Sequence, residues 1–160
     1  GAMFAWALRC LGRLDEALAQ IQKTLEVHPD YSTGIMYLAL ICHEKGMPAE
    51  AISACRRACA IHPLPLGALG YLYGVTGRPD EAKGVLEQLR DLSSQRYYPA
   101  DIVAWVHFGL GDADRAIECL EQGFQERTWT LPYTLSDPSA EPLRSDPRFQ
   151  SLLRRVNLAP

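Results

Sequence analysis

The sequence lacks long apolar runs, an excess of one charge and the compact motifs of common catalytic sites. No stretch of about 18 uncharged apolar residues occurs, so we expect no membrane-spanning helix and no membrane partner. The 16 Lys and Arg residues against 19 Asp and Glu give a formal net charge of −3, and nucleic acid prefers a basic surface. Neither a phosphate-binding Gly-x-x-x-x-Gly-Lys loop nor a Gly-x-Ser-x-Gly nucleophile motif is present. We therefore expect a protein that is not an enzyme and does not bind nucleic acid.

The five cysteines do not form a recognisable metal or disulfide pattern. There is no Cys-x-x-Cys, and no histidine stands at ligand spacing beside them. Cys42, Cys55 and Cys59 fall on apolar helical stripes, where small soft side chains pack well. We therefore expect core cysteines, no metal and no cofactor. An odd cysteine number without a secretion signal favours a reducing cytoplasm.

The sequence instead contains a repeat marked by glycine and other small residues. Four glycines are spaced 34, 31 and 34 residues apart: Gly12, Gly46, Gly77 and Gly111. An alanine follows each by five residues (Ala17, Ala51, Ala82, Ala116), and a small residue precedes each by seven (Ala5, Ala39, Gly70, Ala104). A period near 34 residues is typical of helical repeat arrays.

The second unit, residues 32–63, illustrates the local pattern. An apolar helical stripe precedes Gly46, which supplies the left-handed conformation that ends a helix. Pro48 then suits the first turn of a second helix, and Pro63 ends that helix. Each unit is therefore predicted to be a helix, a tight turn and a second helix, with the small residues at the contact between the two.

With this glycine, alanine and proline pattern the chain resembles the tetratricopeptide repeat family. The resemblance implies an all-α fold, a right-handed α-solenoid of four helix pairs plus a C-terminal capping helix. Residues 3–127 are expected to form the four repeats, at about 3–31, 32–63, 64–96 and 97–127. Residues 1–2 or 1–3 resemble a vector scar.

In such arrays the first helix of each pair lines the concave side, where a protein or peptide binds. Positions three, six and ten residues before the repeat glycine share that face. These positions give an expected peptide-binding groove of Met36, Leu40, His43, Tyr71, Asp101, Trp105 and Phe108. An aromatic groove favours an amphipathic helix or an apolar extended peptide. Alternatively, these aromatic residues pack against a neighbouring helix or the chain's own tail.

The repeat pattern ends after Arg127. Residues 128–145 are rich in proline, serine and threonine and are predicted to be irregular. Asp146 and Pro147 then suit the start of a final helix, with Asp146 as the N-cap. We expect residues 128–160 to cover the exposed end of the last repeat. The alternative is a helix that lies in the groove or in a partner.

The segment from Tyr97 to Leu158 is similar to the C-terminal repeat region of bacterial multidomain regulators. It carries Tyr-Tyr-Pro-Ala-Asp-Ile-Val, Gly-Leu-Gly-Asp-Ala-Asp-Arg-Ala and Pro-Leu-Arg-Ser-Asp-Pro-Arg-Phe-Gln in that order. In those regulators this region follows a winged-helix, serine/threonine kinase or nucleotide (adenylate) cyclase domain. The resemblance implies a sensing or docking module.

Three functions stay open at this stage. The first is a non-catalytic scaffold that binds a protein or peptide in the groove. The second is self-association to a homodimer through the N-terminal end, where Phe4 and Leu8 lack an upstream repeat to cover them. The third is a small-molecule sensor, in which the groove holds a ligand.

Overall fold

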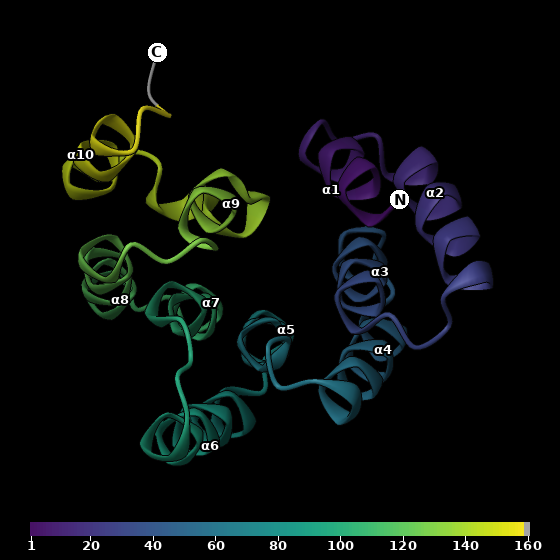
Figure 1. Cartoon of the computed structure of the whole chain (residues 1–160), viewed down its shortest axis with the longest axis horizontal. Coiled ribbons are helices and arrows are strands. Elements are labelled where there is room, and N and C mark those ends of the chain that lie inside the picture. Colours follow the sequence, from purple (N-terminus) through teal and green to yellow (C-terminus); the bar gives the residue numbers. More distant parts are fainter. Residues whose placement is uncertain (159–160) are drawn as a thin grey trace.

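The computed structural model describes residues 1–158, which contain helices and no strand (Figure 1). Eight helices precede the tail: α1 (Ala2–Cys10), α2 (Leu14–Val27), α3 (Ser32–Glu44), α4 (Pro48–Ile61), α5 (Leu66–Val75), α6 (Pro79–Gln95), α7 (Ala100–Leu110) and α8 (Ala113–Glu126). The tail holds α9 (Leu131–Ser136), a 3-10 helix η1 (Pro138–Leu143) and α10 (Pro147–Arg155). The all-α prediction is confirmed.

The eight helices pack as consecutive pairs into a curved α-solenoid, as predicted. Each pair contacts the next, and the first helices α1, α3, α5 and α7 also contact one another along one side. The curvature brings the C-terminal elements round to the N-terminal pair, so that α9 lies across from α1 (Figure 1). One side of the solenoid is therefore partly enclosed by the chain itself.

The repeat glycines end the first helix of every pair in the predicted way. Gly12, Gly46, Gly77 and Gly111 have φ between 72° and 78°, the left-handed region that favours glycine. The residue after each glycine donates its backbone N–H to the carbonyl five positions earlier, as in Arg13 to Leu8 at 2.9 Å. The four turns are thus the same hydrogen-bonded motif, which explains why their spacing is visible in the sequence.

The small residues mark close contacts between helices. The alanines that precede and follow the repeat glycines are completely buried. The approach is closest between α5 and α7, where a Cβ on Gly109 would lie 2.4 Å from the Tyr71 carbonyl oxygen. On the other side of this contact, a Cβ on Gly67 would lie 2.4 Å from the Ile102 carbonyl oxygen. Backbone therefore packs directly on backbone here.

The tail differs from the sequence expectation. Residues 128–145 were predicted to be irregular, but most of them form α9 and η1, because the segment packs on α7 and gains buried contacts there. The predicted N-cap is confirmed: Asp146 accepts a hydrogen bond from the Arg148 backbone N–H, and α10 packs on α8. Residues 159–160, the end of the expected capping segment, lie outside the described residues.

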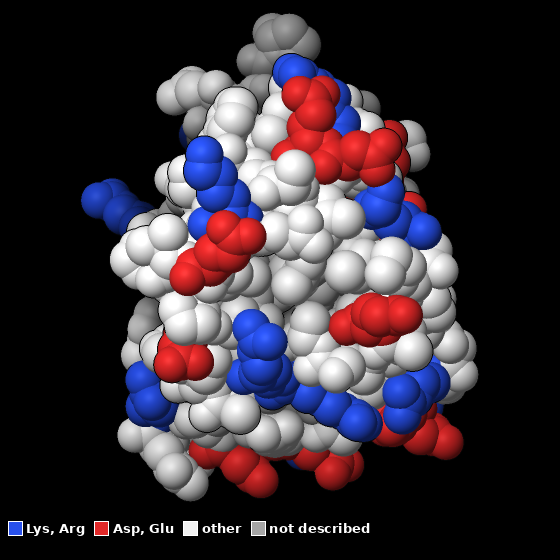
Figure 2. Space-filling model, turned by 90° about the vertical axis from the view of Figure 1, so that its right-hand side faces the viewer, with Lys and Arg blue, Asp and Glu red and all other residues white. Residues whose placement is uncertain are grey.

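The outer face is a mixture of charges. On the face shown in Figure 2, basic and acidic side chains alternate without a large patch of either sign. Exposed ion pairs such as Arg13–Glu16 follow helical spacing. At the N-terminal end, Phe4 is exposed as expected, but the expectation for Leu8 was wrong, because Leu8 is buried in the core. None of the helices within residues 1–158 is long and apolar enough to cross a membrane.

Candidate functional site

The inner face of the solenoid carries a row of aromatic rings from three successive first helices. His43 of α3 meets Tyr71 of α5 at a ring-centroid distance of 5.9 Å. Tyr71 meets Trp105 of α7 at 6.0 Å, and Trp105 meets Phe108 at 6.4 Å. The helical offsets therefore located side chains that lie together in space.

This row is largely covered by residues 128–143, which we call the closing segment. Its side-chain hydroxyls converge on Asp101, a completely buried residue of α7: Thr130 and Thr134 donate at 2.9 Å each, and Thr128 also donates. The indole N–H of Trp105 donates to Thr134 at 3.3 Å. A polar network thus ties the closing segment to the inner face.

A second attachment joins the closing segment to the N-terminal helix. Two guanidinium nitrogens of Arg9 donate to the two oxygens of Asp137, at 2.7 and 3.0 Å. Asp137 also accepts from the Trp6 indole N–H at 3.1 Å and caps η1 through the Ser139 backbone N–H at 2.9 Å. Both side chains of the ion pair are 1 % exposed, so water does not screen it.

The environment of Asp137 opposes its ionisation in one respect and favours it in others. Burial by itself raises the pKa of Asp137, but the ion pair with Arg9 and the hydrogen bonds from Ser139 lower the pKa below its ordinary value. Arg9 also donates its Nε–H to Glu44 of α3 at 2.7 Å. One guanidinium therefore joins α1, α3 and the closing segment.

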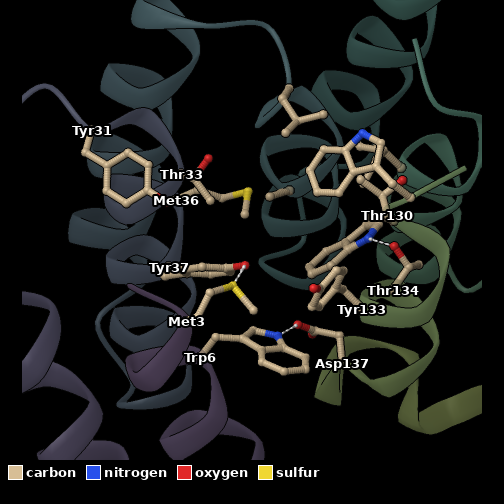
Figure 3. A pocket seen from close by; sticks show the side chains of 15 residues that line it. Met3, Trp6, Tyr31, Thr33, Met36, Tyr37, Thr130, Tyr133, Thr134 and Asp137 are labelled. Carbon is tan, nitrogen blue, oxygen red and sulfur yellow. Dashed lines mark hydrogen bonds between the residues drawn. The ribbon is translucent and has the colours of Figure 1, made fainter. Parts of the chain in front are cut away.

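Between the first helices and the closing segment lies a cavity of about 190 Å³, which we call the inner pocket (Figure 3). It is lined by Met3, Trp6, Tyr31, Thr33, Met36, Tyr37, Leu64, Ala68, Ile102, Trp105, Trp129, Thr130, Tyr133, Thr134 and Asp137. All three tryptophans of the chain belong to this lining. Trp129 is 67 % exposed and Tyr133 42 %, so the rim of the pocket reaches solvent.

The seven residues expected to form the groove divide into two groups. Met36 and Trp105 line the inner pocket. Leu40, His43, Tyr71, Asp101 and Phe108 do not; they lie along the inner face outside the pocket lining. Leu40, Asp101, Trp105 and Phe108 are buried, because the fold and its closing segment cover them. Of the two alternatives left open by the sequence, the burial of these four residues agrees with packing inside the chain and not with an open groove.

Several residues of the site were missed in the sequence, and two of them had a detectable signal. Trp6 and Arg9 stand six and three residues before Gly12, which are the same offsets that located the groove residues of later units. Trp129, Tyr133 and Asp137 lie in the tail, where no repeat fixes the register. Only their aromatic and acidic character within a proline- and threonine-rich segment distinguished them.

The cavity wall offers little for catalysis or for metal binding. The Thr134 hydroxyl and the Asp137 carboxylate are already engaged with Asp101 and Arg9. Within residues 1–158, no three His, Cys, Asp or Glu side chains gather in a way that suits a metal ion. The remaining lining is mostly apolar and aromatic. The geometry therefore suits the binding of a ligand or a partner more than it suits catalysis.

Comparison with known proteins gives one family. Two family models, both described as tetratricopeptide repeat, match residues 2–64 and residues 63–88. Together they span residues 2–88, which is more than half of the 160-residue chain. No match was found among curated proteins.

Proposed function

Because the chain belongs to the tetratricopeptide repeat family, whose repeats generally mediate protein–protein interaction, we propose that it is a non-catalytic protein-binding module. Its partner docks at the mouth of the inner pocket and inserts one side chain. The observation that carries this proposal is the aromatic cavity with a solvent-exposed rim at Trp129 and Tyr133.

The size of the cavity favours a side-chain anchor over a larger ligand. Pockets for drug-sized molecules usually measure about 300–1,000 Å³, whereas the inner pocket measures about 190 Å³. A single apolar or aromatic anchor in a desolvated pocket is the common hot spot of protein interfaces. The closing segment packs on α7, where Trp105 and Phe108 are buried, so the partner contacts the pocket mouth instead of these residues.

The resemblance of residues 97–158 to bacterial regulators supports a more specific proposal. The chain is the docking part of a cytoplasmic bacterial signalling or transcription regulator. The closing segment, which completes the inner pocket, lies within the stretch that carries this resemblance. The coding sequence upstream of residue 3 tests it: a winged-helix, kinase or cyclase domain supports the proposal, and a gene without any such domain contradicts it.

The docking proposal is tested by capture from bacterial lysate followed by titration with the purified partner. The double variant Trp129→Ala/Tyr133→Ala removes two exposed rim residues, and Tyr97→Ala is the matched control, because Tyr97 is 66 % exposed outside the pocket. We expect the double variant to bind at least about tenfold more weakly and the control to bind normally. Equal binding by all three proteins would overturn the proposal.

Self-association through the N-terminal end is a second candidate. Phe4 is 57 % exposed and Leu11 71 % exposed on the first helix and its end, which leaves apolar surface for a second copy. Light scattering over a wide concentration range tests this. A mass that rises towards the dimer supports the candidate, and a constant monomer mass contradicts it.

A further inference from the structure

The wall of the inner pocket is unusually rich in aromatic rings. Six of its lining residues are aromatic: Trp6, Tyr31, Tyr37, Trp105, Trp129 and Tyr133. They come from α1, α3 and its N-terminal flank, α7, and the closing segment. Figure 3 shows Tyr31 and Tyr37 across the cavity from Tyr133. A purely apolar ligand needs no such concentration of rings, since aliphatic side chains would serve equally well.

Neighbouring rings of the wall stand nearly at right angles to one another. Trp6 and Tyr133 have centroids 5.6 Å apart and planes inclined by 76°. Trp129 and Tyr133 lie 6.5 Å apart with an inclination of 69°. Rings inclined in this way face different directions in the wall of the cavity, and we call Trp6, Trp129 and Tyr133 the cage. The faces of aromatic rings carry partial negative charge, which attracts a cation that lies over the ring.

Like the ring faces, the charged residues of the pocket lining favour a cation. Asp137 is the one acidic residue among the lining side chains, and no lysine or arginine is among them. Behind the wall, Asp101 holds Thr130 and Thr134, while Glu44 shares Arg9 with Asp137. The residues that hold the wall in place therefore include three carboxylates and one guanidinium, and that guanidinium contacts Asp137 and Glu44 but not Asp101.

We propose that the inner pocket binds an organic cation of the alkylated ammonium class. The cation is presented either on a partner's side chain, in which case this inference rests on the docking function proposed above, or as a free small molecule. An apolar cavity of about 150 Å³ holds benzene, so a pocket of about 190 Å³ has room for a trimethylammonium group of similar size. Trp129 and Tyr133 at the exposed rim are the rings that such a group meets first.

Two pairs of probes separate the contribution of charge to the binding affinity from the contribution of shape. Choline is compared with 3,3-dimethylbutan-1-ol, which has the same shape and no charge. A capped tripeptide with a central trimethyllysine is compared with its norleucine counterpart. Since all three tryptophans line the pocket, intrinsic fluorescence reports binding directly. We expect the charged probe of at least one pair to bind about tenfold more tightly than its neutral counterpart.

Two variants test whether the probes bind in the inner pocket. Tyr133→Leu keeps every tryptophan and removes one ring of the cage, so we expect it to abolish most of the preference for the cation. Tyr97→Leu, a substitution of an exposed ring outside the pocket, is the matched control and should keep that preference. Circular dichroism is used to check that both variants are folded.

The outcomes distinguish the two proposals. Binding of choline alone assigns the pocket to a free cation, and binding of the trimethyllysine peptide assigns it to a partner's side chain. If neutral and charged probes bind equally, or if Tyr133→Leu keeps the preference, the cation inference is overturned while apolar docking stands. If no probe binds but partner capture still depends on Trp129 and Tyr133, the cation inference alone fails. If no probe binds and partner capture does not depend on Trp129 and Tyr133, both proposals fail.

Discussion

Arg9 and Asp137, 128 positions apart in the sequence, form a buried ion pair that connects the first helix to the start of η1. Contacts in a repeat array usually join neighbouring repeats. This pair instead joins the two ends of the solenoid, and Asp137 also helps to line the inner pocket. The shape of the candidate site therefore depends on an interaction outside the repeat pattern.

Removal of Arg9 should strongly destabilise the fold. Arg9→Met leaves the Asp137 carboxylate buried without its cation, and we expect the free energy of unfolding to fall by about 3–5 kcal/mol. Urea unfolding followed by circular dichroism measures this. The control Arg13→Met removes an exposed ion pair and should change little.

The double variant Arg9→Met/Asp137→Leu should recover part of the loss, because it removes both buried charges together. A recovery would show that the cost of Arg9→Met arises from an unpaired charge. If Arg9→Met is no more destabilising than Arg13→Met, the ion pair does not hold the two ends of the solenoid together.

The contact between α5 and α7 should tolerate no added side chain. In Gly109→Ala the new Cβ would lie 2.4 Å from the Tyr71 carbonyl oxygen, so the helices must separate. We expect a loss of about 1–3 kcal/mol in the free energy of unfolding. Gly84→Ala is the matched control within α6, because nothing lies within 4 Å of its added Cβ. That control should gain about 0.5–1 kcal/mol from better helix propensity.

The repeats could be predicted from the sequence because their geometry is fixed by local chemistry. Each turn needs a left-handed residue, so Gly46 and its equivalents recur at a set distance from the small residues of the helix contact. The same offsets located Tyr71 and Trp105 as neighbours. The same offsets from the repeat glycine also apply to Trp6 and Arg9, because the first repeat has the same spacing as the later ones.

The closing segment could not be placed from the sequence, because its position is set by contacts with distant residues. Nothing near Asp137 in the sequence indicates that its partner is Arg9. In the sequence, nothing distinguishes Thr130 and Thr134 from ordinary loop threonines. Only the structure shows that both donate hydrogen bonds to Asp101. The sequence therefore located the inner face and left coverage by the chain's own tail as one alternative, but it did not indicate which tail residues make the contacts.

Two histidines should make the fold weaker in mild acid. Burial lowers the pKa of His43 below the ordinary value of 6.5, with a further contribution from Arg9. Burial likewise lowers the pKa of His107, whose Nδ1 has no hydrogen-bond partner. A lowered folded-state pKa contributes stability that is present above pH 6.5 and is lost as the pH falls through the folded-state value.

We therefore expect the melting temperature to fall between pH 7 and pH 5, and to fall less in His43→Gln/His107→Gln. The control is His28→Gln, a substitution of an exposed residue, which should follow the wild type. Differential scanning calorimetry at matched ionic strength measures all three proteins. A double variant with the same pH dependence as the wild type would contradict this assignment.

Asp101 should control how firmly the closing segment is held. It accepts hydrogen bonds from three threonines of that segment, and it is completely buried. In Asp101→Ala these hydroxyls lose their acceptor, and each unmade buried hydrogen bond costs about 1–3 kcal/mol. Since about 1.4 kcal/mol is a factor of ten, chymotrypsin should cut residues 128–143 at least about tenfold faster under native conditions. Asp112→Ala, at an exposed helix cap, is the control and should be cut at the wild-type rate. Equal rates in all three proteins would mean that the closing segment is held by apolar packing and Arg9 alone.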